Sequence, residues 1–427
     1  MNFSILFLFL FVSGTYACVG NNPTQLSALK DLYTSTSGSS WKFPTGTSGN
    51  VWLSTNDYCT WQGVMCDSAC NYVTVLELSS VGMKGNLPSS FGNLNGLQVI
   101  DFSINNVNGS LPTNILTVFS SLQTLNIYST DIFGSINGAN GGCTPTLQNV
   151  NIRYTSNSGF DFSQCKGLQS ITAGAYNAGA GGVRALNFPI SSSTTQSQCY
   201  FPNLVYVFFD DTFSNSNIFN ISCFCSTPML EYLSANANVF SGQIPNCLSS
   251  LPKLQYLSLV FNSFTSFQTN NGYPSLEILD VSYNKLSLNF QTLYFPVLVK
   301  GNFNNNAIYG TPYLNIGPLV EILDLSLNLF SGDFPYNIIV PDYLQLVDMR
   351  QNPGMHATGY SFSPMYSIMV QDINQPSPYN IMFCSALTKT VAPYGRTGTI
   401  TIYVSRTYYV NTQYYTAACG TIIYAKN

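Results

Sequence analysis

Two nine-residue stretches, Leu276–Asn284 (LEILDVSYN) and Val320–Asn328 (VEILDLSLN), are nearly the same peptide and begin 44 residues apart. In each, apolar residues alternate with polar ones, as Leu279 and Val281 do in the first stretch, and an Asn closes the pattern. Alternation with period two is typical of a short strand with one buried face. Two near-copies of one strand predict that the chain is built from an internal repeat.

The same pattern recurs along most of the 427 residues. The closing Asn recurs at Asn105 and then six times at intervals of 24, 22, 22, 22 and 24 residues, from Asn238 to Asn352. A period in this range with this pattern predicts a solenoid of about 12 leucine-rich repeats. The predicted units begin at Val73, Leu97, Leu122, Leu147, Leu168, Leu204, Leu230, Leu254, Leu276, Leu298, Val320 and Leu344. The closing Asn residues of the later units are Asn238, Asn262, Asn284, Asn306, Asn328 and Asn352.

The residue types predict how each coil is made. The strands should pair side by side in a parallel sheet on the concave face, with apolar positions stacked inside. Asn suits the exit from the strand because its amide both donates and accepts hydrogen bonds. Several units continue as apolar-x-Gly-x-apolar-Pro, as in 107–112, where Gly permits a bend and Pro fixes φ. The predicted fold is therefore an α/β repeat solenoid with an irregular or 3-10 convex side.

A short segment before the repeats carries a second motif. Trp52 and the run Cys59-x-Trp61-x-Gly63-Val64-x-Cys66 precede the first unit. Together with the repeats, this segment resembles the N-terminal cap of the plant-type extracellular leucine-rich repeat family. That family includes receptor-like kinase and receptor-like protein ectodomains and polygalacturonase-inhibiting proteins. The resemblance covers roughly residues 24–352 and implies a non-enzymatic protein of extracellular recognition.

The chain also departs from the family pattern. Units between 122 and 229 are irregular, since Thr130, Thr155, Tyr176 and Thr212 replace the closing Asn. The unit at 168–203 carries an insertion rich in Gly, Ala, Ser and Thr. Because no transmembrane segment or kinase follows the repeats in this sequence, a receptor-kinase form is not expected.

Four domains are predicted along the chain. Residues 1–17 read as a secretory signal peptide, with an apolar run and small Ala17 at the cleavage point. An N-terminal cap at 18–72 and the solenoid at 73–365 follow. Residues 366–427, where TITIYVS (399–405) alternates cleanly, are expected to form a small β-rich C-terminal cap or domain. We expect the mature protein to be secreted, with retention at the cell surface left open.

Composition excludes several classes of partner. Only 7% of residues are charged and the net charge is -4, so there are no Lys/Arg clusters to bind nucleic acid or an anionic membrane. The concave face is expected to be mostly neutral. No cofactor is expected.

Twelve cysteines in an oxidising compartment predict disulfide bonds. Three pairs lie one repeat apart, at the separation that neighbouring coils provide, and are expected to staple the irregular units. These pairs are Cys143–Cys165, Cys199–Cys223 and Cys225–Cys247. Cys59–Cys66 would close the cap, Cys384–Cys419 the C-terminal region, and Cys18–Cys70 is left by elimination. The sequons at Asn108 and Asn220 are candidate glycosylation sites.

The sequence offers little for catalysis. Its single histidine, His356, lies at the far end of the repeats, and no G-x-S-x-G motif is present. Asp280 and Asp324 lie two coils apart, roughly 10 Å by strand spacing, near the upper limit for an inverting glycosidase pair. Asp is common at this repeat position, so a structural role is the better explanation. Cys223-Phe-Cys225 is read as disulfide cysteines rather than a metal site, and no enzyme is predicted.

The outward positions of the central strands are the predicted ligand-binding surface. Four aromatic residues gather on three consecutive strands, where they could stack on sugar rings or anchor a peptide. Alternatively, they form a ladder that packs on itself and on the 168–203 insertion. The predicted binding residues are Tyr206, Phe208, Asp210, Tyr232, Asn236, Tyr256 and Lys300.

The sequence therefore predicts a secreted or cell-surface recognition protein that binds a protein, peptide or glycan on its concave face. A membrane co-receptor is compatible with this reading. Two alternatives stay open: an inhibitor of a secreted cell-wall-degrading glycosidase, and a structural or adhesion component of the extracellular matrix.

Overall fold

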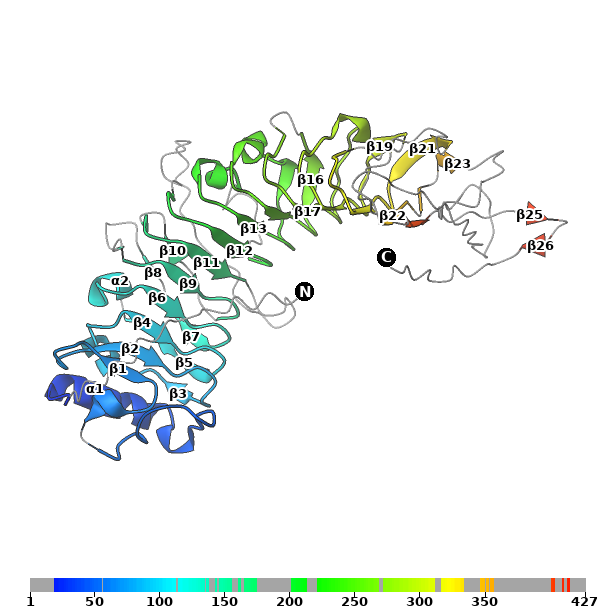
Figure 1. Cartoon of the computed structure of the whole chain (residues 1–427). Coiled ribbons are helices and arrows are strands. Elements are labelled where there is room, and N and C mark those ends of the chain that lie inside the picture. Colours follow the sequence, from blue (N-terminus) through cyan, green and yellow to red (C-terminus); the bar gives the residue numbers. More distant parts are fainter. Residues whose placement is uncertain are drawn as a thin grey trace, which may run out of the picture.

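The computed structural model describes residues 19–333, apart from positions 56, 113 and 135 and the segments 138–142, 144–145, 156–159, 163–164, 175–200, 213–220, 269–271 and 312–315. Beyond 333 it describes 346–349, 351–352, 354–356 and the strand residues 401–403, 409–410 and 413–414. The coils follow one another along an arc, from helix α1 (Pro23–Ser35) at one end to strand β23 (Gly354–His356) near the other (Figure 1). The signal segment 1–17, Tyr176 at a closing-Asn position and most of the insertion lie outside the described residues, and the predicted bounds of the four domains stay predictions.

The cap begins with α1, which closes the first coils. Asn22 precedes the helix, and its Oδ1 accepts hydrogen bonds from the backbone N of Thr24 and of Gln25. The Gln25 side chain then joins the helix to the repeats, because Nε2 donates to the carbonyl of Asn93 and Oε1 accepts from the backbone N of Val73. The buried apolar face of the helix consists of Ala28, Leu29 and Leu32.

All three tryptophans of the chain lie in the cap and pack together. The rings of Trp41 and Trp52 lie 5.0 Å apart, as do those of Trp52 and Trp61. Trp41 directly follows the short helix η1 (Gly38–Ser40) and Trp61 follows η2 (Tyr58–Thr60), and a Cys59–Cys66 disulfide links η2 to strand β1 (Val64–Cys66). Strand β1 pairs antiparallel with the first repeat strand, so the cap covers the end of the sheet as predicted.

One long sheet runs along the concave side of the arc (Figure 1). Among the described residues it has fourteen strands, which are parallel except for the β1–β2 pair. Its strands follow each predicted unit start, and the predicted parallel solenoid is confirmed. After β1, in sheet order, they are β2 (Val73–Glu77), β4 (Val99–Asp101), β6 (Thr124–Asn126), β9 (Asn149–Asn151), β11 (Ser170–Ala173), β12 (Tyr206–Phe209), β13 (Tyr232–Ser234), β15 (Tyr256–Ser258), β17 (Ile278–Asp280), β18 (Lys300–Asn302), β20 (Ile322–Asp324), β22 (Leu346–Asp348) and β24 (Thr401–Tyr403).

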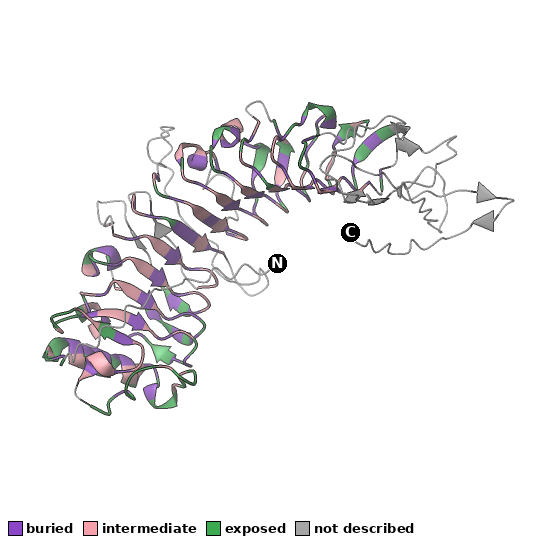
Figure 2. Ribbon diagram, in the orientation of Figure 1, coloured by how far each residue is buried: buried purple, intermediate pink, exposed green. Residues whose placement is uncertain are grey.

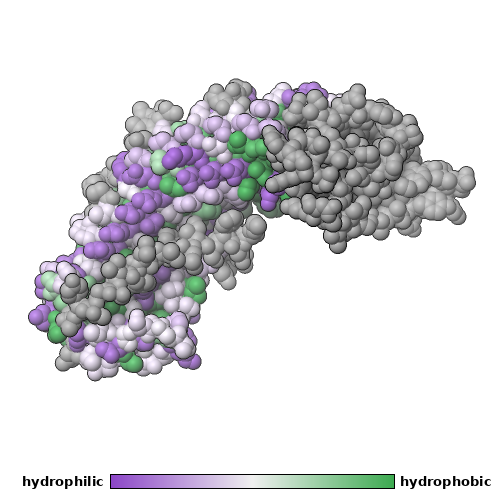
Figure 3. Space-filling model, in the orientation of Figure 1, coloured by the Kyte–Doolittle hydropathy of each residue, from purple (hydrophilic) through white to green (hydrophobic). Residues whose placement is uncertain are grey.

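Burial alternates along these strands because side chains point to opposite faces. In β17 and β20 the central Leu is buried while its neighbours are half-exposed, and Figure 2 shows buried and intermediate residues together on many strands of the sheet. On the face seen in Figure 3, hydrophilic residues form oblique rows across the coils, beside a hydrophobic patch in the C-terminal half. The solenoid thus repeats the same surface position at each coil.

Short second strands and single turns of helix complete the coils. The strands pair in small sheets: β3 (Lys84–Asn86) with β5 (Asn106–Ser110) and β7 (Asp131–Phe133); β8 (Ile136–Asn137) with β10 (Phe160–Asp161); β14 (Ser241–Gln243) with β16 (Ser263–Ser266); and β19 (Tyr309–Gly310) with β21 (Leu329–Asp333) and β23. The convex turns are η3 (Ser89–Asn93), α2 (Ile115–Val118), η5 (Ile221–Ser226), η6 (Asn246–Ser250) and η7 (Phe290–Thr292). The Gly of the Gly-x-apolar-Pro motif lies in these second strands at positive φ, 111° at Gly109. A Cβ there would lie 2.9 Å from the backbone N of Leu87, so the close approach of coils requires glycine.

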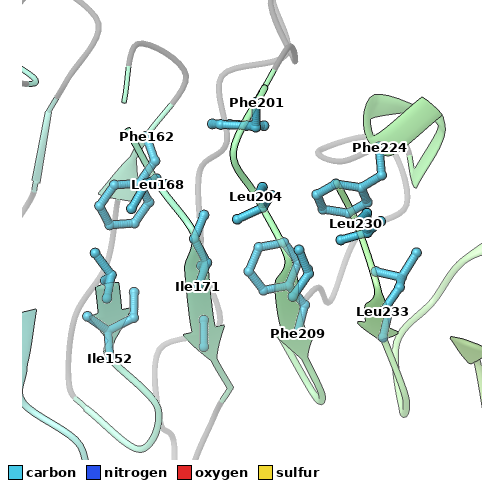
Figure 4. Packing of buried hydrophobic residues seen from close by; sticks show 14 of the residues in the cluster. Ile152, Phe162, Leu168, Ile171, Phe201, Leu204, Phe209, Phe224, Leu230 and Leu233 are labelled. Carbon is cyan, nitrogen blue, oxygen red and sulfur yellow. The ribbon is translucent and has the colours of Figure 1, made fainter. Parts of the chain in front are cut away.

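The core is a continuous stack of apolar side chains between the sheet and the convex turns. In the irregular units, phenylalanines fill this space: Phe162, Phe201, Phe209 and Phe224 lie beside the repeat leucines in Figure 4. Phe209 and Phe224 are in ring contact at 5.9 Å between centroids. Irregular sequence at 122–229 therefore does not interrupt the core in the described coils.

The closing asparagines link neighbouring coils. The amide of Asn105 donates to the carbonyls of Leu78 and Phe102, and its Oδ1 accepts from the backbone N of Gly82 and of Met83. Threonine in the same position bonds within its own coil instead, since Thr130 Oγ1 donates to the carbonyl of Ile127. The substitution of Thr for Asn therefore weakens the link between coils in the irregular units.

Disulfide bonds add further links between neighbouring coils, at a pair of units where Thr155 replaces the closing Asn and at a pair that Asn238 also joins. Cys143–Cys165 and Cys225–Cys247 each span 22 residues and join neighbouring coils, at Cα–Cα distances of 5.1 and 5.3 Å. The structure thus contains both of these predicted disulfide bonds between coils. Cys70 and Cys223 are also disulfide-bonded. Their predicted partners, Cys18 and Cys199, lie outside the described residues, as do Cys384 and Cys419.

Among the described residues, the C-terminal region contributes three short strands, and one of them joins the main sheet. Strand β24 pairs parallel with β22 and adds one strand to the solenoid sheet, while β25 (Tyr409–Val410) and β26 (Gln413–Tyr414) form a hairpin. In the part of the chain that is described, no helix is long and apolar enough to cross a bilayer.

Candidate functional site

The register of the sheet aligns equivalent residues of neighbouring strands in rows. Tyr206, Tyr232 and Tyr256 are partners in adjacent strands β12, β13 and β15 and form what we call the tyrosine row. The same register position continues as Ile278, Lys300 and Ile322 on β17, β18 and β20. The structure therefore brings four of the predicted binding residues into one line along the concave face.

The tyrosine rings stack on one another. The centroids of Tyr206 and Tyr232 lie 4.9 Å apart at an interplanar angle of 20°, and those of Tyr232 and Tyr256 lie 6.2 Å apart at 30°. All three side chains are half-exposed. The predicted alternative, a self-packed aromatic ladder, is thus present, and it leaves ring surface open to solvent. Whether the rings bind a ligand stays a prediction.

Burial changes the acidity of two of these phenols. Desolvation raises the pKa of Tyr206, and the nearby Glu231 carboxylate adds to that effect. Desolvation also raises the pKa of Tyr256, opposed by a hydrogen bond with Ser258 and assisted by Asp280 and Asp210. Both groups stay neutral hydroxyls at physiological pH, so the row offers aromatic faces and hydrogen-bonding hydroxyls rather than charge.

Asp210 and Asn236 occupy a neighbouring row and are tied to the sheet. Asp210 Oδ1 accepts from Ser234 Oγ at 2.7 Å and from the backbone N of Asn236 at 3.0 Å. Asn236 Oδ1 in turn accepts from Ser258 Oγ and from the backbone N of Val260, both at 2.7 Å. These two predicted binding residues therefore hold neighbouring coils in fixed positions, while Phe208 lies half-exposed beside Tyr206 on β12.

The two carboxylates considered as a catalytic pair belong to a similar network. Asp280 Oδ1 accepts from Ser282 Oγ at 2.6 Å and its Oδ2 from Asn302 Nδ2 at 3.1 Å. Asp324 is bonded in the same way to Ser326 and to Asn304. Desolvation raises the pKa of Asp280, although the bonds from Ser282 and Asn302 oppose the shift. This arrangement fits the structural role that the repeat pattern favours.

Carboxylates are the commonest charged groups along the concave strands. Of the chain's 18 carboxylates, nine lie on or beside the outward positions of the concave strands, with only Arg153 and Lys300 as cations among the described residues there. Charged residues are rare in the whole chain, but half of the acidic ones fall at or beside these repeat positions, so carboxylates outnumber cations there. The nine are Glu77, Asp101, Asp210, Glu231, Glu277, Asp280, Glu321, Asp324 and Asp348.

Sequence reasoning missed a second row at the end of the strands. The residue before each closing Asn has a left-handed backbone, including Ile104 (φ 56°), Phe261 (φ 55°), Tyr283 (φ 53°) and Leu327 (φ 55°). All four side chains are exposed, and the rings of Phe261 and Tyr283 lie 4.3 Å apart. Bulky apolar residues rarely adopt this conformation, so their recurrence before Asn was the available signal.

Other candidate sites are separate from the concave face. His356 lies on β23 in a small second sheet, and its side chain is outside the described residues. The sequon residue Asn108 is exposed on β5, whereas Asn220 is not described. Within the described part of the chain, no group of three or more His, Cys, Asp or Glu residues is arranged to hold a metal ion.

Comparison with curated proteins gives plant receptors as homologues. No protein-family model matches the chain. The chain is 37% identical over 79 residues to the LRR receptor-like serine/threonine-protein kinase GSO2 of Arabidopsis thaliana, which is 18% of this chain and 6% of that protein. It is 33% identical over 87 residues to Receptor-like protein 50 of the same plant, 20% of this chain and 10% of that protein. The matches thus span a tenth or less of these two relatives.

Solved structures with a similar fold include leucine-rich-repeat ectodomains of plant receptor kinases. The GASSHO1/SCHENGEN3 ectodomain of Arabidopsis thaliana, in complex with CASPARIAN STRIP INTEGRITY FACTOR 2, superposes with a TM-score of 0.53 at 20% identity, covering 78% of this chain and 45% of that one. A plant ice-binding protein gives 0.52 at 20% identity, covering 75% and 91%. The Arabidopsis HAESA ectodomain, in complex with an IDA peptide hormone ligand, gives 0.50 at 17%, covering 79% and 64%. At these identities the comparison establishes the fold: the chain is a leucine-rich-repeat solenoid of the kind found in plant receptor ectodomains.

Proposed function

We propose that this leucine-rich-repeat chain is an extracellular, non-enzymatic recognition protein that binds a peptide or protein ligand on its concave face. The observation that carries the proposal is the tyrosine row. Three stacked, half-exposed rings on consecutive strands present a rigid aromatic surface, and tyrosine combines large contact area with a hydrogen-bonding end. The plant homologues and the peptide-bound ectodomain of similar fold support the same class of function.

The surrounding hydrogen bonds support this role because they fix the face before a ligand arrives. Ser234 donates to Asp210 and Ser258 donates to Asn236, so these side chains join the coil of β13 to the coils on either side of it. A preformed surface loses little conformational entropy on binding. The open sheet also excludes little water, which is a poor setting for acid–base catalysis and agrees with a binding role.

The experiment is to capture ligands from the organism's own medium and cell surface with the secreted protein, and then to repeat the capture with Tyr206→Ala/Tyr232→Ala/Tyr256→Ala. The matched control replaces three exposed tyrosines elsewhere, in Tyr72→Ala/Tyr294→Ala/Tyr309→Ala. We expect the first variant to lose the ligand and the control to retain it. Equal capture by both variants would remove the tyrosine row as the binding surface. A membrane co-receptor would be found in the same capture.

An inhibitor of a secreted cell-wall-degrading glycosidase is the second candidate function. It is favoured by the nine carboxylates on the concave face, since charge is what such a face needs to engage an enzyme surface. Inhibition of a panel of secreted polygalacturonases by the purified protein tests it directly. The third reading, a matrix or adhesion component, predicts self-association that grows with protein concentration in sedimentation experiments.

A further inference from the structure

The carboxylates beside the tyrosine row are spaced regularly along the solenoid. Glu231, Glu277 and Glu321 each directly precede a residue of that register position, namely Tyr232, Ile278 and Ile322. Each is the residue directly before β13, β17 or β20, and one coil separates each of these strands from the next. At strand spacings of about 4.8 Å, carboxylates two coils apart are separated by roughly 10 Å.

A second line of carboxylates follows the other side of the same register position. Asp280, Asp324 and Asp348 occupy one row, with Asn302 between the first two. The stretch of face from β12 to β22 thus carries seven carboxylates and, among its described residues, Lys300 as its cation. A strip of aromatic and apolar side chains from Tyr206 to Ile322, interrupted by Lys300, therefore runs between two rows of carboxylates.

We infer that the ligand of this face is an extended, cationic peptide segment with Lys or Arg at every third position. The inference rests on the proposed function and specifies its ligand class. An extended polyproline II segment repeats every three residues, which is about 9.3 Å. That distance matches the roughly 10 Å between alternate coils, so successive basic side chains reach Glu231, Glu277 and Glu321 while the peptide backbone lies over the central strip.

The same surface disfavours other ligand classes. A polyanion is repelled by seven carboxylates, and a neutral glycan would stack on the tyrosines but leave the charged edges without partners. A cationic ligand would bind both to the carboxylates and to the tyrosine rings, because ammonium and guanidinium groups are attracted to each of them. Charge complementarity of this kind speeds association and selects partners.

The test uses the full secreted chain and defined peptides in isothermal titration calorimetry. The probe is a twelve-residue Lys-Pro-Pro repeat, compared with a Gln-Pro-Pro repeat and with a peptide of the same composition whose lysines are contiguous. The protein variants are Glu277→Gln/Glu321→Gln and a matched control, Asp31→Asn/Asp131→Asn, which removes two exposed carboxylates elsewhere.

We expect the spaced lysine peptide to bind more tightly than either comparison peptide and to weaken as salt is added. Kd for it should rise about tenfold in Glu277→Gln/Glu321→Gln, since each exposed ion pair contributes up to roughly fivefold, and should be unchanged in the control. Absence of binding by the spaced lysine peptide, equal binding of the glutamine peptide, or equal Kd in both variants overturns the inference. If the natural ligand still depends on Tyr206, Tyr232 and Tyr256 after such a result, the proposed function survives and only the cationic ligand class is lost.

Discussion

The side-chain amide of Asn284 links its coil to the one before it, because its Oδ1 accepts a hydrogen bond from the backbone N of Phe264 at 3.0 Å. Its Nδ2 donates to the carbonyl of Leu259 in that preceding coil and to the carbonyl of Val281 in its own. Asn306 and Asn328 repeat the arrangement. At these turns the Asn side chain thus makes hydrogen bonds to backbone groups that have no partner in the sheet.

Replacing Asn284 with Ala should therefore destabilise the solenoid by about 3 kcal/mol, because it leaves buried backbone groups of two coils without partners. Chemical denaturation measures the loss, and faster hydrogen exchange at the amide of Phe264 locates it. Asn95, an exposed turn residue, provides the control, and Asn95→Ala should stay within about 0.5 kcal/mol of wild type. A cost at Asn284 no larger than this would show that the ladder is dispensable.

The disulfide between Cys143 and Cys165 is expected to replace the missing asparagine link. It closes a separation of 22 residues, for which the chain-entropy model gives about 3 kcal/mol. In Cys143→Ala/Cys165→Ala we expect faster hydrogen exchange in β9 and β11, with unchanged protection in β17 and β20. Uniform loss of protection along the solenoid would argue against a local staple.

Ile104 should be replaceable with a gain in stability. Its backbone is left-handed, which costs a β-branched residue roughly 1 kcal/mol, and 55% of its side chain is exposed, so little burial is lost. The chain itself places Asn305 at the equivalent position of another unit. Ile104→Asn should raise the free energy of unfolding by about 0.5–1 kcal/mol. Ile104→Val keeps the branched Cβ and should give no gain, and an equal effect of both substitutions would exclude backbone strain as the cause.

Tyr273 is a buried tyrosine whose hydroxyl finds no hydrogen-bond partner among the described residues. Its ring packs between Phe267 and Phe295. Tyr273→Phe removes the unpaired hydroxyl and should stabilise the protein by about 1 kcal/mol. Tyr72→Phe, at an exposed ring, is the control.

The same substitution should change alkaline unfolding. Burial raises the pKa of Tyr273, so above about pH 10 the unfolded chain loses the phenol proton while the folded chain retains it. The contribution of this group to the free energy of unfolding is therefore constant below that pH and decreases above it. The phenylalanine variant should therefore unfold at higher pH than wild type. Identical alkaline midpoints would mean that Tyr273 does not limit stability there.

The repeat positions were predictable because they depend on local pattern. The alternation in LEILDVSYN, the closing Asn and the Gly-x-apolar-Pro motif recur at nearly fixed intervals, and each dictates one feature of a coil. Pairs of cysteines one repeat apart gave Cys143–Cys165 and Cys225–Cys247 by the same logic. The second small sheets were not predicted, since strands such as Ser241–Gln243 show no alternation of their own and form only because neighbouring coils align them.

The sequence by itself determined the period, the inward and outward faces of each strand, and the cap that covers the first coil, because these follow from side chains close in the chain. Only the tertiary structure decided which outward side chains of different coils lie next to one another. Stacking the coils in register placed Tyr206 on Tyr232 and brought Glu231, Glu277 and Glu321 to equivalent positions of alternate coils. Half of the 18 carboxylates were thereby placed along one face, since a solenoid repeats the same position of every unit along a single line.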